Sequence, residues 1–271
     1  MPPSQQHQKM RVLTKERLAG AFFLAAVFFL LTSLPASARI AYQFDWSVLW
    51  REPYGRWMLK GLGLTLQIGL ISWLIALFLG IIIGALRTLP SKPLRLIGTV
   101  YVEVFRNIPL LVQLFFWFYA IPPLFGLWLT RMPNLGYYCA IFGLGIYTAS
   151  RVAEHVRSGF FAVPAGQRFA GLSTGLTQFQ LYRYVIIPYA IRIVIPPLTT
   201  EFLTIFKNSA LAMTIGVLEL TGMAYRIDAR TWHGLESTTG AIVGYLIIGL
   251  IIITLGNWLE SKVRIPGLVT R

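Results

Sequence analysis

Acidic residues are scarce in this chain, which carries 10 Asp and Glu against 24 Lys and Arg and has a formal net charge of +14 at pH 7. Charged residues of both signs make up only 13% of the 271 residues, whereas apolar residues make up 56%. This balance lies far outside the range of soluble globular proteins and predicts an all-α polytopic membrane protein. Nucleic acid is not expected as a partner, because the basic residues lie between apolar runs and form no stripe.

Cysteine and histidine are also rare. A single cysteine, Cys139, lies inside an apolar run and excludes a disulfide framework within the chain. Three scattered histidines, His7, His155 and His233, match no metal-ligand spacing. Neither a Gly-rich loop ending in Lys nor a repeat between the two halves is found, so a nucleotide site and a secondary transporter are both disfavoured. We therefore expect no cofactor or metal in this chain, and no enzymatic activity.

Long apolar runs predict six membrane spans, with about twice as many Lys and Arg on one side of the predicted membrane as on the other. The positive-inside rule places both termini in the cytoplasm, together with the loop between the fourth and fifth runs. The predicted spans are Leu18–Leu34, Trp57–Leu86, Leu96–Leu124, Gly136–Val156, Tyr189–Leu218 and Thr238–Leu259.

The first run, Leu18–Leu34, has two interpretations. It is followed by Ala36-Ser37-Ala38, which imitates a signal-peptide cleavage site, yet Arg39 directly after this site disfavours cleavage. We expect a retained anchor, and a cleaved signal peptide is the alternative. The predicted organisation is an N-terminal segment with an external linker (1–56), a membrane domain (57–266) and a cytoplasmic tail (267–271).

The segment Val156–Pro197 contains a polar, Gly-punctuated loop with four arginines and no acidic residue. A short helix over Ala170–Leu172, a stop with positive φ at Gly175 and a second short helix over Gln178–Val185 predict a compact knob. An ordinary cytoplasmic loop held by positive charge is the alternative. The arginines are Arg157, Arg168, Arg183 and Arg192.

Motifs in this segment resemble the cytoplasmic loop of ABC importer permeases of the polar amino acid family, most closely the glutamate/aspartate import permeases. They are Val163-Pro164-x-Gly166-Gln167, Gly175, Tyr184-Val185-Ile186-Ile187-Pro188 and Arg192-x-x-x-Pro196-Pro197. The family's Glu-Ala-Ala triplet reads Phe169-Ala170-Gly171 here, so its acidic residue is missing. The resemblance covers about residues 57–266 and implies a type I ABC importer transmembrane domain, with a five-helix core and one added N-terminal helix, in the bacterial inner membrane.

The same resemblance implies the partners of the chain. An ABC ATPase dimer, which binds ATP-Mg, would dock on the loop, and a periplasmic substrate-binding protein would deliver an amino acid. A second homologous permease would complete a heterodimer in the lipid membrane. The loop residues expected to couple to the ATPase are Gly166, Gln167, Ala170, Gly171, Leu172, Gly175, Leu176 and Pro188.

Arg151 is the strongest candidate for substrate selection. It lies where many polar amino acid permeases carry tyrosine, and a guanidinium there suits a substrate with a second carboxylate. An ion pair with Glu154 on the same helix is the alternative. Further candidates on the next span are Glu201, Lys207, Asn208 and Ser209, although Lys207 could instead snorkel or pair with Glu201.

Glu103 and Arg106 lie three residues apart inside an apolar run, which predicts a same-face ion pair or a role in the transport pathway. Taken together, the sequence predicts the permease of an ATP-driven importer for a polar amino acid, with glutamate or aspartate as the expected substrate. A permease for glutamine or a basic amino acid is the alternative. A secondary transporter and a structural membrane subunit are alternatives that the sequence motifs support less well.

Overall fold

The computed structural model describes residues 42–263, with one side chain, that of Leu127, left out. The chain divides between Phe44 and Asp45 into two compact units, and all helices below belong to the second. Three predictions concern residues outside the described range: the span Leu18–Leu34, whether it is an anchor or a signal peptide, and the tail 267–271.

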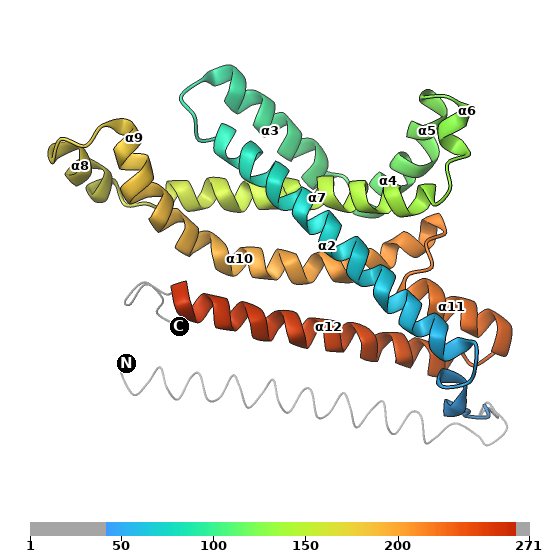
Figure 1. Ribbon diagram of the computed structural model, residues 1–271. Helices are drawn as coiled ribbons and strands as arrows, with labels where there is room; N and C mark the ends of the chain where they lie inside the picture. Colours follow the sequence, from blue (N-terminus) through green and yellow to red (C-terminus); the bar gives the residue numbers. More distant parts are fainter. Residues whose placement is uncertain (1–41, 264–271) are drawn as a thin grey trace, which may run out of the picture. The chain divides into compact units, whose positions relative to one another are not determined.

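Every regular element within residues 42–263 is helical, which confirms the predicted fold class (Figure 1). The long helices are α2 (Tyr54–Leu86), α7 (Leu135–Phe161), α10 (Ile187–Asn208) and α12 (Gly234–Val263). The shorter elements are η2 (Trp46–Leu49), α3 (Lys92–Asn107), α4 (Leu110–Phe115), η3 (Phe116–Ala120), α5 (Ile121–Leu124), α6 (Leu127–Thr130), α8 (Ala165–Ser173), α9 (Gln178–Leu181), η4 (Tyr182–Ile186), η5 (Ser209–Ile215) and α11 (Leu220–Thr231).

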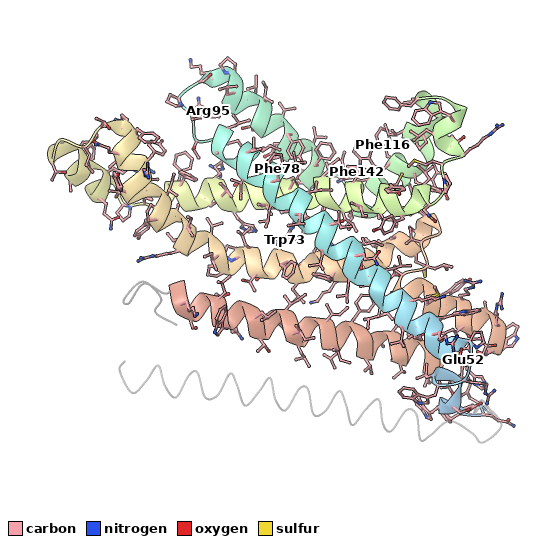
Figure 2. All side chains as sticks on the ribbon, in the orientation of Figure 1. Glu52, Trp73, Phe78, Arg95, Phe116 and Phe142 are labelled. Atoms are coloured by element: carbon pink, nitrogen blue, oxygen red, sulfur yellow. The ribbon has the colours of Figure 1, made fainter. Side chains whose placement is uncertain are left out.

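Three helical stretches among the described residues are long and apolar enough to cross a membrane, namely Tyr54–Leu86, Gln178–Ile215 and Gly234–Lys262. A fourth is formed if the bent pair α3 and α4–α5 counts as one span. Large apolar side chains point away from the bundle, including Phe78, Phe116 and Phe142 (Figure 2). An apolar exterior of this kind suits a protein that is solvated by lipid.

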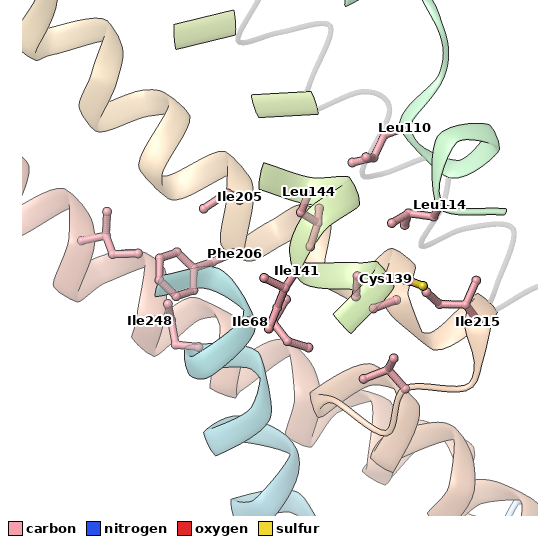
Figure 3. Packing of buried hydrophobic residues seen from close by; sticks show 14 residues of the cluster. Ile68, Leu110, Leu114, Cys139, Ile141, Leu144, Ile205, Phe206, Ile215 and Ile248 are labelled. Atoms are coloured by element: carbon pink, nitrogen blue, oxygen red, sulfur yellow. The ribbon is translucent and has the colours of Figure 1, made fainter. Parts of the chain in front are cut away.

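Helix α7 forms the centre of the fold and packs against α2, α3 and α10. The main apolar core gathers around it, with Ile68 from α2, Leu144 from α7 and Ile205 from α10 all fully buried (Figure 3). Helices α2 and α7 approach closely because small residues line their contact: a Cβ atom added to Gly80 would lie 2.5 Å from Cγ1 of Val152. Thus α7, which carries Arg151, Glu154 and Arg157, is enclosed by the other helices.

The predicted span Leu96–Leu124 is not one continuous helix, because α3 and the helix that begins at Leu110 meet at 102°. Pro109 lacks a backbone donor and forces Ile108 into an extended conformation, with φ −88° and ψ 130°. The side-chain amide of Gln113 donates to the carbonyl oxygens of Phe105 (2.7 Å) and Ile108 (2.9 Å). Gln113 therefore supplies partners that the broken helix ladder no longer provides.

The expected ion pair between Glu103 and Arg106 was wrong. Glu103 instead accepts a hydrogen bond from Nδ2 of Asn107 at 2.9 Å. Arg106 lies 3.9 Å from a carboxylate oxygen of Glu154 on α7. A guanidinium is attracted to a carboxylate on a neighbouring helix just as strongly as to one on its own helix. Spacing along one helix therefore did not identify the partner of Arg106.

The predicted stop at Gly175 is confirmed, since this residue ends the loop after α8 with φ +84°. The predicted second helix is not a separate short element. Thr177 and Gln180 form a capping box that starts α9, which continues through the π-turn η4 directly into α10. The π-turn lies just before Pro188, whose missing N–H interrupts the α-helical ladder without ending the helix.

The close contact between α2 and α7 generates a prediction. Gly80→Ala places a Cβ atom 2.5 Å from Val152 and 2.9 Å from the carbonyl oxygen of Ala149, so the helices must separate. We expect the free energy of unfolding to fall by about 1–3 kcal/mol, and the midpoint of thermal unfolding in detergent to fall with it. Gly63→Ala on the same helix is the control, because its Cβ meets nothing within 4 Å. Equal midpoints for both variants would contradict the close packing.

Candidate functional site

A bidentate ion pair joins Arg151 of α7 to Glu201 of α10. Nε and one terminal nitrogen of Arg151 donate to the two carboxylate oxygens of Glu201, at 2.7 and 2.8 Å. Glu201 is only 2% exposed, whereas the Arg151 side chain is 39% exposed. This parallel arrangement is the strongest geometry in which a guanidinium binds a carboxylate. The pair therefore links two long helices in the interior of the bundle.

His155 completes this group, which we call the Arg151 triad (Arg151, His155 and Glu201). It lies four residues after Arg151 on the same face of α7, and its Nε2 is 3.1 Å from Oε1 of Glu201. From the sequence, His155 was only one of three scattered histidines without a metal-ligand spacing, and its contact with Glu201 was not predicted. The i, i+4 spacing from Arg151 was the available signal.

Arg151 pairs with Glu201, so the alternative pair with Glu154 is wrong. The alternative pair of Lys207 with Glu201 is also wrong, because within residues 42–263 the basic side chains that contact Glu201 are those of Arg151 and His155. Glu201 turns toward α7 because α7 and α10 pack together, whereas Lys207 is exposed.

Glu154 is the centre of a second group, which we call the Glu154 cluster. Its carboxylate binds Arg157 on the same helix at 2.6 Å and the buried Arg87 at the end of α2 at 2.5 Å. Arg106 of α3 is the more distant member, at 3.9 Å. This cluster ties three helices together and leaves Arg151 for Glu201.

Lys207, Asn208 and Ser209 lie apart from the Arg151 triad. They occupy the end of α10, where it tightens into the 3₁₀ turn η5. Lys207 is six residues beyond Glu201, or about 9 Å along the helix axis. Ser209 is buried, and its hydroxyl donates to the carbonyl oxygen of Phe206 at 2.7 Å. The structure therefore brings together Arg151 and Glu201 but not the other three predicted substrate residues.

Glu219 is a buried charge directly before α11, and it was not among the predicted site residues. It is fully buried and caps α11, where it accepts a hydrogen bond from the backbone N–H of Gly222 at 2.8 Å. Its carboxylate also accepts hydrogen bonds from Thr65 of α2 and Tyr245 of α12. An acidic residue directly before a helical run was the signal for this cap. Glu219 joins three helices at the end of the bundle away from α8.

The loop expected to couple to an ATPase sorts into exposed and buried positions. Gly171 faces inward, since a Cβ atom there would lie 2.6 Å from Leu181, and Leu176 is half-buried. Arg168 holds α8 in place by donating to the carbonyl oxygen of Phe160. The exposed predicted positions are Gly166, Gln167, Ala170, Leu172, Gly175 and Pro188.

An apolar surface lies beside these exposed positions. Phe169 is 68% exposed, and Leu172 is exposed next to it. A cavity of about 220 Å³ separates α8 from the start of the next helix and is lined by Phe169, Leu172 and Tyr182 among others. The α8 surface therefore offers apolar side chains and a small hollow to a partner.

Residues 76–265 match the protein family described as "Binding-protein-dependent transport system inner membrane component". The chain is 38% identical over 237 residues to the glutamate/aspartate import permease protein GltJ of Escherichia coli K12, covering 83% of this chain and 96% of that protein. It is 32% identical over 223 residues to the glutamine transport system permease protein GlnP of the same organism, covering 82% of this chain and 99% of that protein.

Solved structures agree with this match. An amino acid ABC transporter crystallised with histidines has a TM-score of 0.74 and 31% identity, over 82% of this chain and all of that chain. The inward-facing MetNI methionine ABC transporter, with a TM-score of 0.66 at 22% identity, supports the fold alone. The chain has the transmembrane fold of type I ABC importers and is a transport component, not an enzyme. It therefore belongs to the family of binding-protein-dependent transport system inner membrane components, the permease subunits of ABC importers.

Proposed function

We propose that this chain is the permease subunit of an importer that moves glutamate or aspartate across the bacterial inner membrane by alternating access. The main evidence for an acidic substrate is the guanidinium of Arg151, which already binds a carboxylate with hydrogen bonds of 2.7 and 2.8 Å. The side chains of glutamate and aspartate end in the same group. The likeness to GltJ, which is named a glutamate/aspartate import permease, supports this choice.

The chemistry of the site favours an acidic amino acid over a basic one or one with a side-chain amide. A charge inside a membrane protein faces protein or a water-filled path, because exposure to lipid is costly. Arg151 is 39% exposed, so a ligand can reach it. A basic side chain would be repelled there, and a neutral amide could not form the bidentate ion pair that a carboxylate forms with the guanidinium. Glutamine is the second candidate, because GlnP is 32% identical over nearly its whole length.

Transport energy would come from a separate ATPase dimer that binds ATP-Mg and docks on α8. The exposed Phe169 and Leu172 support this assignment, because they supply apolar surface at a loop whose angle is set by Gly175. ATP binding at the partner would bias the bundle between two states. A second homologous permease in a heterodimer, surrounding lipid and a periplasmic binding protein complete the proposed assembly.

The orientation follows from where the basic loops lie. Figure 1 shows the α8–α9 loop and the turn between α2 and α3 toward one end of the bundle, with α11 and the start of α2 toward the other. The first end carries Arg87, Lys92 and Arg95 as well as Arg168 and Arg183. The positive-inside rule supports a cytoplasmic location for this end and for both termini.

Gly175 provides a test of the coupling loop. Nothing lies within 4 Å of a Cβ atom at this position, so a substitution acts through the backbone angle φ +84° and not through a clash. We expect Gly175→Val to abolish ATPase stimulation by glutamate-loaded binding protein while the permease remains in the membrane. Gly175→Asn is the matched variant, because Asn tolerates this conformation, and it should keep most of the stimulation. Full stimulation in the Val variant would contradict the assignment.

Orientation is tested with single cysteines in a Cys139→Ala background. Ser173→Cys on α8 and Ala229→Cys on α11 both lie at exposed positions. A membrane-impermeant maleimide should label Ala229→Cys in intact spheroplasts, and Ser173→Cys only in inverted vesicles. The opposite labelling pattern would show that the proposed orientation is inverted.

Arg151 provides the test of the substrate. Arg151→Ala should weaken glutamate binding and glutamate-stimulated ATPase activity by roughly 10-fold to 150-fold, because a hydrogen bond to a charged group contributes about 1.5–3 kcal/mol. Arg151→Lys should recover part of this loss, since it keeps the charge but not the fork.

The control for this test addresses assembly. Arg151→Ala leaves the buried Glu201 with His155 alone, so the double variant Arg151→Ala/Glu201→Gln should improve complex yield without restoring the glutamate response. If Arg151→Ala assembles well and still responds fully to glutamate, the acidic substrate assignment is wrong.

A further inference from the structure

We propose that Glu201 is an intramolecular competitor of the substrate: it occupies Arg151 in the empty permease, and a substrate carboxylate displaces it onto His155. This inference rests on the proposed acidic substrate and adds how the same site selects it. Glu201 would be a specificity residue, because a ligand must present a carboxylate to Arg151 to regain the ion pair that is lost when Glu201 leaves.

The first support is the geometry of the occupied fork. Glu201 uses Nε and a terminal nitrogen of Arg151 at once, the arrangement that a substrate carboxylate would also seek. A second carboxylate on the other edge of the guanidinium would meet a cation that Glu201 has already neutralised. An acidic ligand therefore gains most by replacing Glu201 and not by binding beside it.

The second support is that a displaced Glu201 keeps a partner. A buried carboxylate that loses its only partner is strongly destabilising, and Glu201 is 2% exposed. Nε2 of His155 is 3.1 Å from Oε1 of Glu201, the oxygen that also accepts from the terminal nitrogen of Arg151. His155 can therefore hold the carboxylate after Arg151 has turned to the substrate, without a large movement of α10.

The third support is that the exchange is confined to these residues. Arg87 and Arg157 are bound to Glu154, and within the described part of the chain no basic side chain other than those of Arg151 and His155 lies within 4 Å of Glu201. No neighbouring arginine is therefore placed to take over Glu201. A side-chain amide cannot replace the lost carboxylate, so a ligand that presents an amide to Arg151 is rejected by the cost of breaking the salt bridge.

The test is equilibrium binding of radiolabelled L-glutamate to the full complex in lipid nanodiscs, without binding protein. Glu201→Gln removes the competing charge, and we expect the Kd for glutamate to fall about tenfold. Glu52→Gln is the matched control, because it removes an exposed carboxylate just before α2 and away from the Arg151 triad, and it should leave the Kd unchanged.

A double-mutant cycle tests the role of His155. His155→Gln should weaken glutamate binding about tenfold in the wild-type background, because displaced Glu201 then lacks its partner. The same change should have no effect when residue 201 is Gln, since no charge needs a new partner. An equal loss in both backgrounds would mean that His155 acts only on the structure, and it would overturn the exchange.

The outcomes separate this inference from the substrate assignment. If Glu201→Gln binds glutamate no more tightly while Arg151→Ala abolishes binding, the competitor role is wrong and the acidic substrate stands. If Arg151→Ala also leaves the Kd unchanged, the substrate assignment itself fails. Should Glu201→Gln not assemble, Glu201→Asp keeps the buried charge but is one methylene shorter. It should lower the Kd several-fold, because it cannot span both nitrogens as well, and an unchanged Kd would overturn the proposal.

Discussion

Neutralising the charges on α7 is the constraint on which the rest of the structure depends. This central helix carries Arg151, Glu154 and Arg157 inside a bundle whose exterior is apolar. Charges in such an interior need partners, because burial without a partner costs several kcal/mol per ion. Each neighbouring helix supplies one: Arg87 comes from α2, and Glu201 comes from α10. The polar contacts therefore fix which faces of these helices meet.

Close packing makes these contacts possible. Val152 and Val156 of α7 pack directly against Gly80 and Gly84 of α2. The two backbones are therefore close enough for Arg87 to bind Glu154. Gly159 of α7 makes a similar close contact with Val194 of α10. A rigid, closely packed α7 can transmit a change at its charged residues to the helices around it. The proposed transport cycle needs such a connection between Arg151 and the loop at α8.

Several features could be predicted from the sequence with good accuracy. The long apolar runs of α2, α10 and α12 indicated the spans, and Gly175 indicated the turn with positive φ. Pro109 was apparent in the sequence, but a continuous helix was predicted across it. The chain bends by 102° at this point, and Gln113 donates hydrogen bonds to the backbone carbonyl oxygens that the broken helix leaves without partners. The break depends on a side chain four residues away, which a hydropathy pattern does not weigh.

The sequence by itself determined the membrane class, the apolar helices α2, α10 and α12, the loop glycine and the presence of an interior cation at Arg151. These features follow from local properties, namely hydropathy, helix periodicity and backbone preference. Only the tertiary structure decided the partner of each charge. Arg151 had a carboxylate three residues away at Glu154, yet it binds Glu201, fifty positions along the chain, because Arg87 and Arg157 hold Glu154. Charges respond to distance in space, and that distance is set by the packing of helices and not by their order in the sequence.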